Sequence, residues 1–241
     1  MAEPLLRVDG VVKRFGGFTA LNGVSLEVRA GERFGLIGPN GSGKTTLINC
    51  VSGTLRSDAG RIFFRGRDIT GLPAHQRTRE GIARTFQIPR PFGSMTVVEN
   101  LRITLEYAAL DRAAPGDGVG EAMDILRMVG LDAKARVVSS RLTQIEMRKL
   151  ELARAMAAKP ALLISDEAMA GLSSSEVDDL LMILFRLNEA GTTVIMIEHI
   201  MRAVMRFSER LAVLDTGEKI AEGSPANVIT DKAVERAYLG E

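Results

Sequence analysis

A glycine-rich segment at residues 38–45 constrains the possible folds of this chain more than any other feature. The segment fits the pattern G-x-x-x-x-G-K-[ST] and reads Gly38, Pro39, Asn40, Gly41, Ser42, Gly43, Lys44 and Thr45. Residues 33–37 before it are typical of a short strand, and residues 44–51 after it have helical spacing. In this context the pattern predicts a loop that joins a strand to a helix in an α/β fold.

The same segment has the composition of a phosphate-binding loop. Its glycines allow successive backbone N–H groups to point at phosphate oxygens, where side chains would collide. The helix that begins near Lys44 adds its N-terminal dipole, the Lys44 ammonium can reach β- and γ-phosphates, and the Thr45 hydroxyl can ligate Mg²⁺. The alternative is a chance glycine-rich turn, which average composition would produce in on the order of one chain in a hundred. The flanking strand and helix make phosphate binding the better interpretation.

Apolar stretches typical of strands alternate with helical patterns along most of the chain. The further strand candidates are residues 82–85, 161–165, 193–197 and 211–214, and residues 174–189 have the spacing of an amphipathic helix. Strands separated by helices indicate βαβ units and a mostly parallel sheet.

Two regions depart from this alternation. Residues 1–30 and 60–70 are rich in β-branched and aromatic residues with turn glycines, which predicts an antiparallel sheet beside the parallel one. Residues at about 97–158 have almost no strand signal, and helical patterns occur at 97–109, 121–129 and 143–157. The expected architecture is one α/β domain over residues 1–241, in which a P-loop NTPase core carries an antiparallel β subdomain and an inserted helical subdomain at about 88–158.

The charge balance argues against nucleic acid as a partner. Lys and Arg number 31 against 30 Asp and Glu, a net charge of +1, so no bulk attraction to DNA, RNA or anionic lipid is expected. The apolar runs are shorter than the ~18 residues of a membrane-spanning helix, and the N-terminus lacks the apolar segment of a signal peptide. The single cysteine, Cys50, rules out an internal disulfide, fits a reducing cytosol and is expected to be buried. We therefore expect a cytoplasmic protein whose membrane attachment, if any, goes through a protein partner.

An apolar strand candidate at residues 162–165 ends in two adjacent acids, Asp166 and Glu167. Neighbouring strand residues face opposite sides, so the two carboxylates need not share one task. At the end of a buried strand near the phosphate loop, Asp166 could hold Mg²⁺ through its water shell, and Glu167 could polarise the water that attacks the γ-phosphate. An acid pair alone would more often be a solvated strand end, but the phosphate loop favours the functional interpretation.

Two more polar residues follow predicted strands. His199 comes after the strand candidate at 193–197, and Gln87 comes just past the one at 82–85. A lone histidine is more often structural, but the carboxyl ends of parallel strands meet at the edge of the sheet where ligands collect. Gln87 could coordinate Mg²⁺ or the attacking water.

Taken together, these segments resemble the ATP-binding subunits of ABC transporters over nearly the whole chain. By this resemblance Gly38–Thr46 is the Walker A loop, Leu162–Asp166 the Walker B strand, Glu167 the catalytic glutamate, Gln87 the Q-loop glutamine and His199 the switch histidine. Phe15 matches the aromatic residue that stacks on adenine in this family; without the resemblance it would be taken for an ordinary core residue. The implied cofactors are ATP, bound by Phe15, Thr46 and the loop residues named above, and Mg²⁺, held by Thr45, Gln87 and Asp166.

A narrower resemblance concerns importers for branched-chain amino acids. The segments that carry it are Gly81–Phe92, Ile220–Pro225 and Ala237–Glu241. It implies a second ATPase subunit in a homo- or heterodimer, two transmembrane permease subunits and, indirectly, a periplasmic binding protein. It also implies a peripheral position on the inner face of the cell membrane. Proteins of this type also serve urea, short amides and aromatic acids, so the solute stays open.

The signature loop departs from the L-S-G-G-Q of the family. The matching residues are Leu142, Thr143, Gln144, Ile145 and Glu146. By the resemblance, Thr143 faces a nucleotide bound by the partner, where the β-carbon of Ile145 takes up room. The Glu146 carboxylate would be unfavourable there unless it turns away or pairs with Arg148 or Lys149. In addition, Ser173 replaces the aspartate usual in the D-loop.

These departures favour the hypothesis of a heterodimer with one fast and one slow site. Its alternative is that a small backbone shift accommodates Ile145. Outside transport, a soluble ABC-type ATPase is a second possibility, although this chain has neither long coiled coils nor two fused ATPase units. A P-loop kinase would need an acceptor pocket, and a GTPase would need an N-K-x-D element that this sequence lacks. A binding-only role would require Glu167 to be idle.

Overall fold

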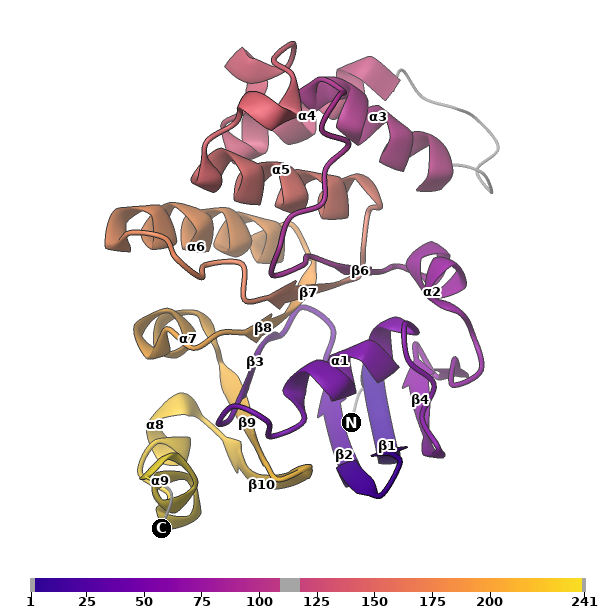
Figure 1. Ribbon diagram of the computed structural model, residues 1–241, viewed down its shortest axis with the longest axis vertical. Coiled ribbons are helices and arrows are strands. Elements are labelled where there is room, and N and C mark those ends of the chain that lie inside the picture. Colours follow the sequence, from indigo (N-terminus) through magenta and orange to yellow (C-terminus); the bar gives the residue numbers. More distant parts are fainter. Residues whose placement is uncertain (1–2, 109–117, 240–241) are drawn as a thin grey trace.

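Two β-sheets and the helices that cover them form the molecule, which the computed structural model describes for residues 3–108 and 118–239 (Figure 1). The larger sheet runs through the middle of the view, the smaller sheet lies at the lower right, and a group of helices lies at the top. The two sheets match the predicted division into a mostly parallel and an antiparallel part.

Within the described residues, the larger sheet has six strands in the order β10-β9-β3-β8-β7-β6. They are β3 (Arg33–Ile37), β6 (Ile82–Arg84), β7 (Leu162–Asp166), β8 (Thr193–Ile197), β9 (Arg210–Asp215) and β10 (Glu218–Gly223). Neighbouring strands are parallel except β9 and β10, which form an antiparallel pair. The prediction of a mostly parallel sheet is confirmed, although β10 was not among the expected strands.

Both faces of the larger sheet are covered. Leu163 of β7 and Met196 of β8 pack on the face of α6 (Ser174–Glu189) and α7 (Met201–Phe207). Leu162 and Ile195, their neighbours in sequence, pack on the opposite face with α1 (Lys44–Ser52) and the smaller sheet. Strands buried on both faces read as continuous apolar runs, which is why they were visible in the sequence.

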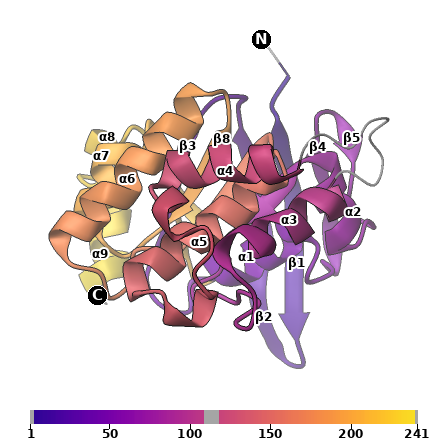
Figure 2. The same ribbon diagram turned by 90° about the horizontal axis from the view of Figure 1, so that it is seen from above.

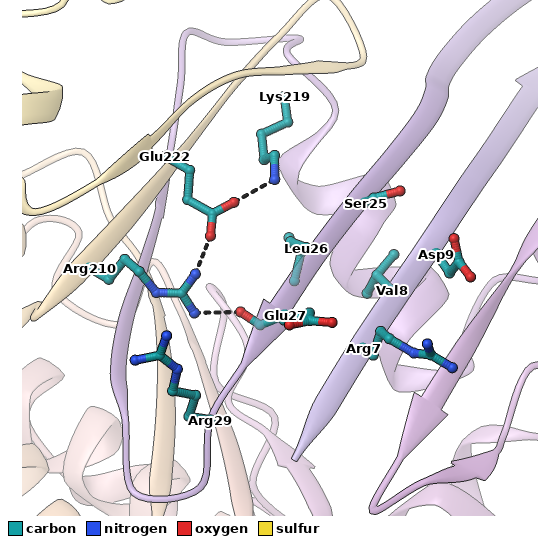
Figure 3. A pocket seen from close by; sticks show the side chains of 10 residues that line it. All are labelled: Arg7, Val8, Asp9, Ser25, Leu26, Glu27, Arg29, Arg210, Lys219 and Glu222. Atoms are coloured by element: carbon teal, nitrogen blue, oxygen red, sulfur yellow. Dashed lines mark hydrogen bonds and ion pairs between the residues drawn. The ribbon is translucent and has the colours of Figure 1, made fainter. Parts of the chain in front are cut away.

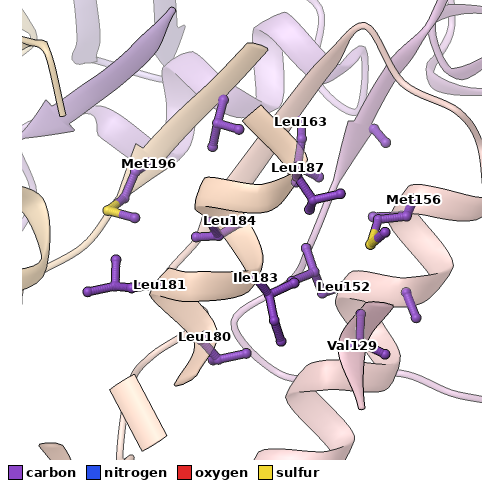
Figure 4. Close-up of a cluster of buried hydrophobic side chains, with 14 of the residues drawn as sticks. Val129, Leu152, Met156, Leu163, Leu180, Leu181, Ile183, Leu184, Leu187 and Met196 are labelled. Carbon is purple, nitrogen blue, oxygen red and sulfur yellow. The ribbon is translucent and has the colours of Figure 1, made fainter. Parts of the chain in front are cut away.

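Helix α6 lies between the sheet and the helices above it. Its predicted apolar stripe, which includes Leu180, Leu181, Leu184 and Leu187, is buried. Figure 4 shows these side chains between Met196 of β8 and the residues of the upper helices. The amphipathic helix was predicted with the bounds that the structure has.

The smaller sheet is antiparallel, with strand order β2-β1-β4-β5. Its strands are β1 (Leu6–Phe15), β2 (Phe18–Val28), β4 (Ala59–Phe64) and β5 (Arg67–Asp68). Strands β1 and β2 form a hairpin in which Phe15 pairs with Phe18 across a tight turn. Cys50 of α1 is buried beside this sheet, as expected, and burial raises the pKa of its thiol to about 11.

The segment between β6 and β7 is helical. It contains α3 (Val97–Ala108), α4 (Gly118–Val129), α5 (Gln144–Ala157) and short 3₁₀ turns at Asp132–Lys134 (η1) and Ser139–Arg141 (η2). The three predicted helices are present; residue 109, expected to end the first, lies outside the described residues, and α4 begins three residues before its predicted start. Treating about 88–158 as an inserted subdomain of one domain stays an interpretation.

The remaining helices are α2 (Ala74–Glu80), α8 (Pro225–Val228) and α9 (Lys232–Leu239). Seen from above, α3, α4 and α5 lie over the molecule, with α6 to α9 on one side and α2 on the other (Figure 2). Among the helices in the described ranges, none combines the length and the apolar character needed to cross a membrane.

The parallel strands position the candidate site. Asp166 at the end of β7 is paired with Ile197 at the end of β8, and β3 lies next to β8 in the same direction. The loops that follow these strands and β6 therefore all begin at one edge of the sheet.

Candidate active site

The phosphate loop connects β3 to α1 along a path that requires glycine. Gly38 has a φ of +148° and Gly43 a φ of +102°, which L side chains rarely adopt. A Cβ at Gly38 would lie 2.0 Å from the carbonyl oxygen of Leu214, and one at Gly43 would lie 2.7 Å from that of Ala20. Gly43 caps α1 without a side-chain hydrogen bond, so the helix presents its first backbone N–H groups and its positive dipole end to the loop.

The Lys44 side chain is buried and folds back over this loop. Its Nζ donates to the carbonyl oxygens of Gly38 at 2.7 Å and Pro39 at 2.8 Å. Burial lowers the pKa of Lys44, and the negative charges of Glu167 and Asp166 oppose that shift. The ammonium therefore lies between the phosphate loop and the acid pair.

A cavity of about 290 Å³ opens over the loop. Its lining comes from the β1–β2 hairpin, the phosphate loop with the start of α1, and the loops after β7 and β8: Phe15, Phe18, Ala20, Asn40, Gly41, Ser42, Gly43, Lys44, Thr45, Thr46, Glu167 and His199. Both phenylalanine rings are largely exposed. Two apolar rings at one side and an ammonium with backbone N–H groups at the other suit a nucleotide, which has a flat base and a charged phosphate chain.

Glu167 is hydrogen-bonded to both Gln87 and His199. The Gln87 amide Nε2 donates to Glu167 Oε2, and His199 Nε2 lies 3.0 Å from Glu167 Oε1. The Glu167 backbone has a φ of +47°, which is unusual for a residue with a side chain. Its N–H donates to the carbonyl oxygen of Ile197 at 2.9 Å, so the turn after β7 is fixed against the end of β8. Three polar side chains from three loops thereby meet at one point.

Asp166 is buried and paired with Arg84 of β6. Arg84 Nη2 lies 2.6 Å from Asp166 Oδ2, and Arg84 Nη1 lies 2.6 Å from the side-chain oxygen of Asn49 on α1. The Asp166 N–H also donates to the hydroxyl of Thr85 at 3.2 Å. These contacts orient the carboxylate between β6 and the helix that follows the phosphate loop.

The structure brings together most of the residues proposed from the sequence. Phe15, residues 40–46, Glu167 and His199 line one cavity, and Gly38 and Pro39 precede that stretch of the loop. Gln87 contacts Glu167, and Asp166 directly precedes it in the chain. Thr143 lies elsewhere, at the N-cap of α5, and is not among the residues that line the cavity. A role for Thr143 in a site completed by another chain stays a prediction.

Sequence reasoning missed four residues around this site. Phe18 could have been found from the Gly16-Gly17 turn that places it opposite Phe15. Arg84 is a charged residue in an otherwise apolar strand, which is a signal of pairing. Arg148 and Glu198, which are buried close to the loops of Gln87 and Glu167, had no such local signal.

Comparisons with known proteins agree with this geometry. The family model described as ABC transporter matches residues 21–170. The chain belongs to the ABC transporter family.

Full-length relatives narrow the comparison. The chain is 40% identical to the high-affinity branched-chain amino acid transport ATP-binding protein LivG of Salmonella typhimurium over the whole of both chains. It is 38% identical to the protein BraF of Pseudomonas aeruginosa, which has the same description, again over both full lengths. A probable LivG of Archaeoglobus fulgidus is 37% identical, with 98% of this chain and 95% of that protein covered.

Solved structures agree as well. A nucleotide-free ATP-binding cassette from an ABC transporter has a TM-score of 0.89 and 35% identity, with 99% of this chain and all of that chain covered. The ADP conformation of an ATP-binding cassette gives the same TM-score and identity over all of both chains. The protein is accordingly a nucleotide-binding ABC ATPase with the fold of these cassettes.

In this ABC ATPase the N–H groups at the start of α5, where the sequence predicts the signature loop, are capped by side chains of the same segment. Thr143 and Glu146 form a reciprocal capping box, in which Glu146 Oε2 accepts from the Thr143 N–H at 3.0 Å. Lys134 Nζ lies 2.5 Å from Glu146 Oε1. The bond from Lys134 is the largest cause that lowers the pKa of Glu146, and the bond from the Thr143 N–H is the next.

Of the two arrangements considered for the Glu146 carboxylate, turning away or pairing with Arg148 or Lys149, the pairing does not occur, since Glu146 pairs with Lys134. Arg148 points to backbone carbonyl groups, and Lys149 lies 3.6 Å from Asp179 of α6. The reason is helix geometry: a side chain at the N-terminus of a helix is best placed to bond the free N–H groups of the first turn. Ser173, which the resemblance places in the D-loop, likewise caps α6 together with Glu176.

A second cavity, of about 410 Å³, lies between the smaller sheet and β9–β10 (Figure 3). Its central cation, Arg210, pairs with Glu32 and Glu222 and donates to the carbonyl oxygen of Glu27. Lys219 also pairs with Glu222. The bond from Arg210 to Glu27 joins β9 to β2 of the smaller sheet, and the other bonds fix the Arg210 side chain, so we interpret the charges here as structural.

Proposed function

We propose that this chain is the ATP-hydrolysing subunit of an importer for branched-chain amino acids. The cavity that gathers two aromatic rings, the phosphate loop, Glu167 and His199 carries the proposal for ATP hydrolysis. The full-length identity to proteins described as branched-chain amino acid transport ATP-binding proteins supports the solute class.

Nucleotide binding would use the two ends of the cavity. The adenine base would stack on Phe15, the more buried of its two phenylalanine rings. The phosphates would lie against the N–H groups of residues 40–46, and the Lys44 ammonium would exchange its carbonyl acceptors for phosphate oxygens. An ammonium already desolvated by burial gains more from a phosphate than one that is fully hydrated.

The residues present fit a magnesium ion. The Thr45 hydroxyl, the Gln87 amide oxygen and the Asp166 carboxylate are the oxygen ligands that this ion prefers. When bound, the ion would neutralise charge on the β- and γ-phosphates.

Hydrolysis would be carried by Glu167. Its carboxylate accepts a proton from a water molecule as that water's oxygen bonds to the γ-phosphorus and the bond to the bridging oxygen breaks, which gives ADP and phosphate. Gln87 and His199 contact opposite oxygens of Glu167 and would hold it toward the water. The positive φ of Glu167 directs its side chain away from the line of β7 and into the cavity.

We further propose the partners that such a subunit needs. They are a second ATPase subunit, two transmembrane permease subunits and, indirectly, a periplasmic binding protein, with this chain on the cytoplasmic face of the membrane. The signature Thr143 would then contact the nucleotide held by the second subunit. Robust ATP turnover by the isolated chain at high dilution would contradict this dependence on a partner.

The capped N-terminus of α5 favours two ATP sites that hydrolyse at different rates. Glu146 already occupies the N–H of Thr143 and places a carboxylate where a phosphate of the partner's ATP would approach. We therefore propose fast turnover of ATP held by this chain and slow turnover of ATP held by the partner. Glu167→Gln in this chain should abolish most turnover, whereas the equivalent change in the partner should not. The opposite pattern would reverse the assignment.

Two experiments test the function. Purified chain with magnesium should bind ATP, and Lys44→Ala should not; equal binding by both would contradict the nucleotide site. Cells that lack the chain should lose uptake of labelled leucine, isoleucine and valine, and the wild-type gene but not Glu167→Gln should restore it. Loss of urea, acetamide or benzoate uptake instead would change the solute class, and unchanged uptake of all of them would favour an ABC ATPase outside transport.

A further inference from the structure

Two buried charged residues lie behind the polar side chains of the active site. Arg148, on α5, is 8% exposed, and Glu198, directly before His199, is 3% exposed. Neither lines the nucleotide cavity. Buried charges are costly unless they have defined partners, so their contacts indicate what they do.

Arg148 joins the loop after β6 to the loop after β7. Its Nη1 donates to the carbonyl oxygen of Gln87 and lies 3.5 Å from that of Phe86. Its Nη2 donates to the carbonyl oxygen of Ala170 at 3.3 Å. Gln87 and the turn that carries Glu167 are thereby held by one rigid, planar guanidinium.

Glu198 joins the loop after β7 to the end of β8. Its Oε1 accepts from the backbone N–H of Met169 at 2.8 Å, and the N–H of His199 also donates to its carboxylate. Met169 lies two residues after Glu167 and is fully buried. Burial raises the pKa of Glu198 to about 7, and the negative charge of Glu167 adds to this shift.

Arg148 therefore links the loop after β6 to the loop after β7, and Glu198 links the loop after β7 to the end of β8. The loop after β7, which carries Glu167, is bonded to both residues. The negative charges of Glu198 and Glu151 both stabilise the cationic Arg148, and the effect of Glu198 is the larger. Because Arg148 lies on α5, five residues after the signature Thr143, a shift of that helix would move the carbonyl group of Gln87 with it.

We propose that Arg148 and Glu198 are positioning residues that hold Gln87, Glu167 and His199 in register for ATP hydrolysis, with Arg148 acting through Gln87 and Glu198 through His199. This inference rests on the proposed function. It adds residues that do not touch the nucleotide and that link the helical segment to the hydrolytic step.

The experiment measures ATP binding and hydrolysis by the assembled transporter. Arg148→Met should lower kcat on the order of tenfold, because small displacements of catalytic groups are costly, with the affinity for ATP nearly unchanged. In a double-mutant cycle, Arg148→Met combined with Gln87→Ala should be no slower than Gln87→Ala alone. Glu198→Gln keeps an oxygen acceptor and should stay within about threefold of the wild-type rate, whereas Glu198→Ala should lose activity and add nothing to His199→Ala.

Arg154→Met is the matched control. Arg154 lies on the same helix and donates to the carbonyl oxygen of Arg90 in the loop after β6, but the structure shows no bond from it to the loop of Glu167. In the double variant, the loss in kcat caused by Arg154→Met and the loss caused by Gln87→Ala should multiply. Multiplying effects for Arg148→Met and Gln87→Ala, or a wild-type rate for Arg148→Met, would overturn the inference while leaving the proposed function standing. A wild-type complex that binds or hydrolyses no ATP would overturn both.

Discussion

Replacing Glu198 by glutamine is expected to make the stability of this protein less sensitive to pH. The Glu198 side chain is buried at the end of β8, and burial is the largest of the causes that raise its pKa from 4.5 to about 7. The nearby charge of Glu167 raises it further, while Arg148 and the N–H groups of Met169 and His199 partly oppose the shift. Glutamine has nearly the same shape as the protonated acid but cannot ionise.

The direction follows from proton binding. The folded protein binds this proton more tightly than the unfolded chain, so the resulting stabilisation is fully present below pH 4.5 and is lost as the pH rises to about 7. At about 1.4 kcal/mol for each pH unit, this window corresponds to about 3 kcal/mol of unfolding free energy as an upper bound. Because glutamine does not ionise, the Glu198→Gln variant should not lose this stability as the pH rises.

The assay is urea unfolding of both proteins at pH 5 and pH 8, followed by circular dichroism. The variant should gain stability relative to wild type on going from the lower to the higher pH, by about 2–3 kcal/mol. Glu189→Gln, at an exposed position near the end of α6, is the control and should show a much smaller change. If the unfolding free energies of wild type and Glu198→Gln differ by the same amount at pH 5 and pH 8, the argument that ionisation of buried Glu198 destabilises the fold is refuted.

Three further outcomes are expected. Phe15→Ala should weaken ATP binding about 5- to 150-fold, because stacking a base on an aromatic ring contributes about 1–3 kcal/mol. A titration with a fluorescent ATP analogue measures the affinity, and a larger effect of Phe18→Ala would move the stacking role to that ring. Gly38→Ala should destabilise the fold by about 3 kcal/mol or more, because its Cβ would lie 2.0 Å from the Leu214 carbonyl oxygen; an unchanged melting temperature would contradict the path of the loop. Arg77→Met should cost about 3–5 kcal/mol in urea unfolding, since this buried guanidinium donates to four backbone carbonyl groups that would lose their partner; a loss below about 1 kcal/mol would show that water replaces it.

Much of the fold could be predicted because it depends on local patterns. Buried parallel strands are nearly continuous apolar runs, so β7 and β8 were found with bounds within one residue. The amphipathic spacing of α6 gave its bounds directly. Strand β10 was missed because none of its residues is buried and three of the six are charged, and it forms a strand by pairing with β9.

In the candidate site, too, residues with a local sequence signal were predicted, and residues that act through long-range contacts were not. The glycines and Lys44 of the phosphate loop follow one another in sequence, and the acid pair stands at the end of a strand that can be recognised, so both were found. Lys134, the ion-pair partner of Glu146, was not among the partners considered, because it lies twelve residues earlier in the chain and meets Glu146 only in the folded structure. Phe18, Arg84, Arg148 and Glu198 act through contacts with residues that are distant in sequence or backbone atoms of other loops.

The sequence by itself thus determined which residues could bind phosphate and activate water, since those abilities belong to the side chains and to the short segments that carry them. Only the tertiary structure decided that Gln87, Glu167 and His199 meet, because parallel strand order brings the ends of β6, β7 and β8 to one edge. It also decided the pKa of Glu198 and the bonds of Arg148, because burial and hydrogen-bond partners arise from packing between segments, which no local pattern contains.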